Sequence, residues 1–181
     1  METGSKTTDL VYIALAAVLI AVCSWISLPM AVPFTLQTFA VFCALELLGG
    51  RRGTIAVCVY ILLGAVGLPV FSGFTGGIGK LLGTTGGYII GFAVSSLIFW
   101  AIEVICGKSP AVRIVSLILG LLACYAFGTA WFMYVYAKDT GPIALGTALG
   151  WCVIPFIIPD LVKLALAHLI SVRISRSVKI R

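Results

Sequence analysis

Residues 8–27 read TDLVYIALAAVLIAVCSWIS, an apolar run that carries a single charge at Asp9. A helix needs about 20 such residues to cross the hydrocarbon core of a bilayer, where no water can satisfy the backbone polar groups. Only one basic residue, Lys6, precedes the run, and no small-residue cleavage site follows Leu28. We therefore interpret the run as a first transmembrane helix and not as a removable signal peptide.

Five further apolar runs follow, separated by Gly, Pro or charged residues. They predict helices over 36–48, 54–70, 86–106, 112–136 and 154–172, of which the first is short for a spanning helix. Of the 181 residues, 61% are hydrophobic and 10% are charged, whereas about a quarter of a soluble domain is charged. Because no polar linker divides the chain, residues 1–181 are expected to form one all-α integral membrane domain of six transmembrane helices.

The basic residues indicate an orientation for this domain. If the N-terminus is cytoplasmic, nine of the twelve Lys and Arg residues lie inside, namely Lys6, Arg51, Arg52, Lys108, Arg113, Arg173, Arg176, Lys179 and Arg181. Cytoplasmic loops carry such an excess of positive charge, so both termini are predicted to be cytoplasmic. The net charge of +6 therefore needs no nucleic-acid partner. A site for nucleic acid or acidic lipid headgroups in the tail 173–181 is the less favoured alternative.

The sequence contains no pattern typical of an enzyme or a metal site. The six acidic residues are dispersed, the single histidine, His168, lies among Leu and Ala, and the six cysteines are scattered in apolar runs. The string GGIGK departs from a phosphate loop, because Phe74 and Leu81 occupy the positions of its first Gly and its Ser or Thr. We expect no catalytic residue, no cofactor and no metal. His168 is expected to be a packing or helix-contact residue, and the cysteines are expected to be small packing residues.

The last run contains two opposite charges, Asp160 and Lys163, which are three residues apart on one helix face at its predicted outer start. Either charge at the centre of a spanning helix costs about 2.5 to 3.5 kcal/mol, so such groups usually face a cavity and serve function. The positive end of the helix dipole favours Asp160 at this place and disfavours Lys163. Two anions are open to Lys163: the carboxylate of Asp160 or that of a ligand.

Other polar residues are expected at the same outer end. Thr35 and Gln37 open the second helix, where a Thr commonly caps the helix end. The segment 71–87, FSGFTGGIGKLLGTTGG, carries seven glycines and includes Thr85. Composition favours two interpretations equally: a flexible external loop, and a folded cap that lines a ligand site. Convergence of these groups within an apolar wall is typical of a small-molecule pocket.

Small residues on the first helix offer a surface for close helix contact. Ala14, Ala17 and Ala21 share one face of the predicted helix, and small residues at this spacing let helix backbones approach closely. The residues alone favour internal packing of this face, with docking of a partner's helix as the alternative.

Three segments together resemble the BioY family of biotin transporters: VPFTLQTFAVFCALELLGGRRG at 32–53, YILLGAVGLPVFSGFTGGIGKLLGTTGGYIIGF at 60–92 and PDLVK at 159–163. The resemblance implies a six-helix substrate-binding component, or S component, of an energy-coupling factor (ECF) transporter, which captures biotin from outside. It further implies that Asp160 and Lys163 contact biotin. The residues around which its cavity would form are Gly76, Gly77, Thr85, Gly86 and Tyr88.

The same resemblance implies partners in the cell membrane of a prokaryote. Helix one would pack through Ala17 and Ala21 against a transmembrane coupling subunit of the EcfT type, and two ATPase subunits would hydrolyse ATP. Three residues depart from the family pattern: Thr84 replaces a Pro, Pro159 replaces a Gly, and Lys80 adds a charge. The group of biotin that each charged residue contacts stays open. The alternatives are an S component for another water-soluble vitamin and a non-catalytic membrane assembly protein.

Overall fold

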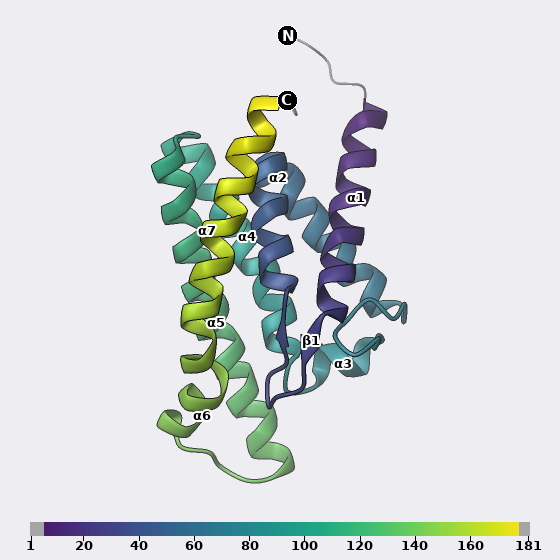
Figure 1. The fold of residues 1–181 in the computed structure, drawn as a ribbon. Helices are drawn as coiled ribbons and strands as arrows, with labels where there is room; N and C mark the ends of the chain where they lie inside the picture. The colour runs from purple at the N-terminus through teal and green to yellow at the C-terminus, as the bar shows by residue number, and fades with distance from the viewer. Residues whose placement is uncertain (1–5, 178–181) are drawn as a thin grey trace.

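A computed structural model describes residues 6–177 of the chain and shows a bundle of long helices (Figure 1). The helices are α1 (Lys6–Trp25), α2 (Gln37–Ala65), α3 (Ile78–Leu82), α4 (Gly86–Cys106), α5 (Pro110–Asp139), α6 (Leu145–Cys152) and α7 (Ile154–Ser177). Two short antiparallel strands, β1 (Ser27–Leu28) and β2 (Phe34–Thr35), connect α1 to α2. The all-α fold predicted from the apolar runs is confirmed.

Within residues 6–177, five helical segments are long and apolar enough to cross a membrane: α1, α2, α4, α5 and the stretch Leu145–Ser175, which comprises α6 and most of α7. The predicted runs 36–48 and 54–70 lie in the two halves of α2, between which the chain reverses at Gly49 (φ 78°, ψ 171°). The reversal brings Gln37 and Tyr60, which are 23 residues apart, within a hydrogen bond of 3.0 Å. The expected separation of the two runs is therefore confirmed, although Arg51 and Arg52 lie at the start of the second half and not in a loop. The six predicted spans correspond to five long helices, of which α2 consists of two halves.

The break in α2 is bridged by a buried ion pair. In an unbroken helix the N–H of Gly50 would donate to the C=O of Glu46, four residues earlier. Here the Glu103 carboxylate accepts the Gly50 N–H at 2.6 Å, and the Arg113 guanidinium donates to the Glu46 C=O at 2.9 Å. Arg113 and Glu103 are themselves 3.5 Å apart. Side chains from α4 and α5 thus supply partners for these two backbone groups, which would pair with each other in an unbroken helix.

Glycines allow α4 and α5 to pack closely. A Cβ atom at Gly91 would overlap Cys124, and one at Gly128 would overlap the ring of Tyr88. No side chain larger than the hydrogen of glycine fits at these positions. The backbones of α4 and α5 can therefore approach each other closely. Tyr88 is positioned by this packing and by a hydrogen bond of 2.9 Å between its hydroxyl and that of Thr129.

The small-residue face of α1 is largely used inside the chain. Ala17 and Ala21 are 2% and 7% exposed, whereas Ala14 is exposed. The internal packing that the sequence favoured is therefore observed for two of the three residues. Of the proposed partner-facing set, only Ala14 is open to another protein.

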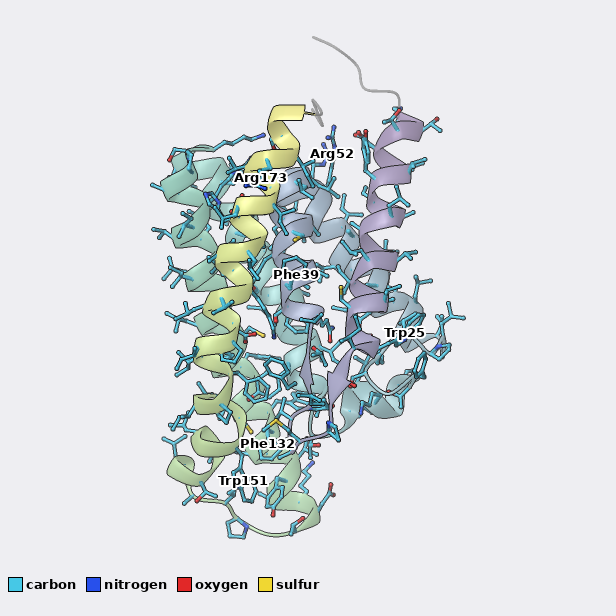
Figure 2. All side chains as sticks on the ribbon, viewed as in Figure 1. Trp25, Phe39, Arg52, Phe132, Trp151 and Arg173 are labelled. Atoms are coloured by element: carbon cyan, nitrogen blue, oxygen red, sulfur yellow. The ribbon has the colours of Figure 1, made fainter. Side chains whose placement is uncertain are left out.

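The start of α1 and the end of α7 lie at the same end of the bundle, and β1, α3 and α6 lie at the opposite end (Figure 1). Figure 2 places Arg52 and Arg173 at the end that carries the termini. This arrangement agrees with an even number of crossings and with basic residues gathered on one side. Lys179 and Arg181 of the predicted basic tail lie outside the described residues.

The glycine-rich segment 71–87 is folded. Phe71 is fully buried and pairs with Thr75 through an isolated β-bridge, after which α3 forms a short helical turn. A Cβ at Gly76 or Gly86 would overlap the backbone carbonyl of Leu68 or Leu81. The folded cap, one of two readings left open by the composition, is the observed one.

Candidate ligand-binding cavity

A cavity opens at the end of the bundle that carries β1, α3 and α6. About 680 Å³ between its walls is free of protein atoms, part of it open to solvent. Its lining residues come from the hairpin and α2, the glycine-rich segment, and helices α4 to α7: Val32, Pro33, Thr35, Gln37, Thr38, Ser72, Lys80, Thr85, Tyr88, Ile89, Phe92, Leu121, Cys124, Tyr125, Cys152, Phe156, Asp160 and Lys163. The wall is mostly apolar, with a small number of convergent polar groups, as in small-molecule sites.

The charged pair of α7 lies in this cavity. Lys163 Nζ is 2.8 Å from Asp160 Oδ1, and the two residues are only 6% and 2% exposed. Because α7 begins at Ile154, the pair occupies its second and third turns. The prediction that the charges sit at the helix start was wrong, and the helix dipole does not explain their placement. The ion pair itself neutralises both charges.

Groups from α2, α5 and β2 complete the bonding of the pair. Asp160 Oδ1 accepts from the Thr38 hydroxyl at 2.9 Å, and Asp160 Oδ2 accepts from the Tyr125 hydroxyl at 2.6 Å. Lys163 Nζ donates to the Thr35 carbonyl at 2.7 Å and to Thr38 Oγ1 at 3.1 Å. The ammonium also lies 4.2 Å from the centre of the Phe34 ring, a cation–π contact. The site is thus an electrically neutral, hydrogen-bonded cluster in an apolar wall.

Six of the nine predicted binding residues line the cavity: Thr35, Gln37, Thr85, Tyr88, Asp160 and Lys163. Gly76, Gly77 and Gly86 are not among the described residues that line it. Gly76 and Gly86 allow close backbone approach, and Gly77 has a positive φ of 92° before α3. These glycines shape the segment that bears Thr85, and contact between them and a ligand stays a prediction.

Thr35 and Gln37 have roles at the start of α2. The Thr35 hydroxyl accepts the backbone N–H of Gln37 at 3.2 Å, but the N-cap of α2 is Leu36 and no side chain caps it, so the expected capping by Thr35 is not observed. Gln37 Nε2 donates to the Tyr60 hydroxyl at 3.0 Å. Both side chains therefore have protein partners while also facing the cavity.

The sequence reasoning missed two residues that bind the charged pair, Thr38 and Tyr125. Thr38 directly follows the predicted Gln37, one position further along the helix. Tyr125 lies in the middle of the apolar run of α5, where nothing in the local pattern distinguishes it from a packing aromatic. Lys80, noticed only as an additional charge, also lines the cavity.

Comparisons with known proteins agree on one family. The sequence profile of the BioY family matches residues 1–180. The chain is 42% identical over 161 residues to the biotin transporter BioY of Thermotoga maritima, covering 87% of this chain and 90% of that protein. It is 34% identical over 153 residues to the biotin transporter BioY of Rhodobacter capsulatus, covering 81% of this chain and 80% of the relative.

A solved structure has the same fold. The crystal structure of an S component for biotin from an ECF-type ABC transporter superposes with a TM-score of 0.82 at 26% sequence identity. The match covers 97% of this chain and 95% of the solved one. The similarity therefore extends over the whole bundle and includes the end that bears the cavity.

Proposed function

This chain belongs to the BioY family, and we propose that it is the S component of an ECF-type biotin uptake system, a transporter subunit and not an enzyme. It binds biotin from outside the cell and delivers it across the membrane together with an energising module. The observation that carries this proposal is the neutral Asp160–Lys163 pair buried in a mostly apolar cavity. The choice of biotin as the ligand rests on the relatives that are named biotin transporters.

Biotin has two different polar ends. Its ureido group has two N–H donors and one oxygen acceptor and is neutral, whereas its valerate chain ends in a carboxylate. A cluster that is itself neutral, with one acceptor group (Asp160) and one donor group (Lys163), matches the ureido end. A ligand carboxylate would be repelled by Asp160 and would compete with it for Lys163.

The carboxylate of biotin is better matched by Lys80. This side chain also lines the cavity, from α3, and none of the ion pairs among the described residues includes it. We therefore place the ureido group at Asp160 and Lys163 and the carboxylate toward Lys80. The apolar rings and chain would lie against Phe92, Leu121 and other apolar lining residues between these ends.

Calorimetry on detergent-solubilised protein tests the function and the pose together. Wild type is titrated with biotin, with biotin amide, which has no carboxylate, and with thiamine and riboflavin. We expect selective binding of biotin. Lys80→Met should weaken the binding of biotin much more than that of biotin amide, whereas Lys163→Met should weaken the binding of both ligands. The reverse pattern would overturn the pose, and well-folded wild type that does not bind biotin would overturn the function.

The energising partners follow from the same proposal. The chain has no phosphate-loop motif of its own, so ATP would be hydrolysed by two ATPase subunits attached to an EcfT-type coupling subunit. The exposed face of α1 supports docking of that subunit: it presents Ala14 beside Val11, Leu15 and Val18. Ala14→Trp should therefore prevent co-purification of the coupling subunit while biotin binding by the isolated chain stays intact. Normal co-purification of the coupling subunit with Ala14→Trp would exclude this face as the docking surface.

The membrane is proposed to be the cell membrane of a prokaryote, with the termini in the cytoplasm and the cavity facing outward. This orientation is supported by the gathering of basic residues at the end that carries the termini, where Arg52 and Arg173 lie (Figure 2).

A further inference from the structure

Three helices donate hydrogen bonds to the carboxylate of Asp160. Thr38 comes from α2, Lys163 from α7 and Tyr125 from α5. Of these donors, only Tyr125 binds Oδ2, and its distance of 2.6 Å is typical of a strong hydrogen bond from a hydroxyl to a charged oxygen. Tyr125 also lines the cavity.

Counting acceptor sites shows what is left for a ligand. An ionised carboxylate has about four lone-pair sites, two on each oxygen. On Oδ1 both sites are used, by Thr38 and Lys163, and on Oδ2 one site is used, by Tyr125. The remaining acceptor site is on Oδ2, the oxygen that Tyr125 holds. A ligand N–H that binds Asp160 without displacing a protein donor must share Oδ2 with Tyr125.

We propose that Tyr125 is a positioning and specificity-determining residue of the binding site, an inference that rests on the proposed function. Its hydroxyl fixes the carboxylate of Asp160 and restricts it to one additional donor. This arrangement suits a single N–H of a neutral urea. It disfavours a cationic cyclic guanidine, because Lys163 already balances the charge of Asp160 and Tyr125 occupies one of the two sites on Oδ2.

The test compares biotin with 2-iminobiotin, in which a guanidine that is cationic at neutral pH replaces the urea. In wild type, biotin should bind more tightly than iminobiotin. Tyr125→Phe removes only the hydroxyl and should lower biotin affinity by about tenfold, in line with the loss of a hydrogen bond to a charged group. Affinity for iminobiotin should fall less, so that the ratio of the two dissociation constants shifts toward iminobiotin by about threefold or more.

Tyr136→Phe is the matched control, because Tyr136 lies on the same helix and outside the described cavity lining. It should change neither affinity nor the ratio. A second measurement does not depend on ligand: the infrared carboxylate bands of Asp160, identified by subtracting the spectrum of Asp160→Asn, should shift in Tyr125→Phe and not in Tyr136→Phe.

The outcomes separate the inference from the function on which it rests. Wild type that fails to bind biotin overturns the proposed function and this assignment with it. Wild type that binds biotin, with equal loss of both ligands in Tyr125→Phe, shows that Tyr125 contributes only to packing. An unshifted carboxylate band leads to the same conclusion even if Tyr125→Phe binds no ligand.

Discussion

The carboxylate of Glu103 accepts the backbone N–H of Gly50 at 2.6 Å, in place of the helical carbonyl that the break in α2 removes. The two residues lie on different helices, α4 and α2. Arg113 of α5 completes the arrangement by donating to the Glu46 carbonyl. Where the chain reverses between the two halves of α2, buried backbone polar groups need partners inside the protein. Glu103 and Arg113 supply these partners.

Removal of the Glu103 carboxylate should strongly destabilise the fold. Glu103→Ala leaves the Gly50 N–H and part of the Arg113 guanidinium buried without a partner, and we expect a loss of about 3 to 5 kcal/mol in the free energy of unfolding. Glu103→Gln should cost less, because its amide oxygen still accepts the N–H. Unfolding in mixed micelles measures both. The control is Asp9→Ala, which breaks the partly exposed Asp9–Arg52 pair and should cost at most about 1 kcal/mol. Equal stability of all three variants would exclude the bridging role.

The break itself should require glycine. Gly49 adopts φ 78° and ψ 171°, a combination that is essentially restricted to glycine and costs other residues about 1 to 3 kcal/mol. Gly49→Ala should therefore lower the midpoint of thermal unfolding, although the nearest atoms leave room for a methyl group. Gly79→Ala, with open space and no positive φ, is the comparison and should be neutral. If the two variants unfold at the same temperature, the backbone conformation of Gly49 does not limit the stability of the fold.

A substitution outside the cavity should weaken ligand binding through Tyr88. A Cβ at Gly128 would overlap the ring of Tyr88. Tyr88 itself lines the cavity, whereas Gly128 is not among its lining residues. Gly128→Ala should displace this ring or separate α4 from α5 and raise the dissociation constant for biotin by about tenfold or more, as overpacking typically costs about 1 to 3 kcal/mol. Gly146→Ala in α6, where nothing lies within 4 Å, should bind biotin like wild type. Unchanged affinity in Gly128→Ala would show that the ring can move without consequence.

Accessible thiols test the orientation. Cys106 is an exposed cysteine and the last residue of α4, a helix that ends on the side of the termini (Figure 1). A membrane-impermeant maleimide should label it in inverted vesicles and not in intact cells. Asp139→Cys, placed at the other end of the neighbouring helix α5 in a variant with Cys106→Ser, should give the opposite result. Labelling of Cys106 from outside would reverse the proposed orientation.

The apolar runs were sufficient to predict most of the fold. The run 86–106 coincides with α4, because Gly107, with a positive φ of 87°, ends the helix at the point where the sequence turns polar. The two runs within α2 were separated correctly, but the reversal lies at Gly49 and not in a loop at Arg51 and Arg52. Arg51 and Arg52 indicate a loop by their charge, yet both lie on a helix at the end of the bundle that carries the termini, where Arg52 pairs with Asp9. Charge alone does not distinguish a loop from the end of a spanning helix.

The candidate site was predictable where polar groups stand out from an apolar background. Asp160 and Lys163 are conspicuous in this way, and the structure shows them paired within the cavity. Tyr125 is inconspicuous, because which face of a long apolar helix turns inward depends on packing against neighbouring helices, here chiefly α4. The glycines around Thr85 were predicted as lining, but the sequence does not show whether a glycine faces a ligand or a neighbouring backbone.

The internal pairing of Lys163 with Asp160 bears on how readily the site can be emptied. Each charged group of the pair has partners within the protein itself, so departure of a bound molecule leaves no isolated charge in a dry environment. Release therefore avoids the penalty of several kcal/mol that an uncompensated buried ion would impose. A carrier must release its cargo as reliably as it captures it, and a binding site whose charges are paired within the protein lowers the barrier to release.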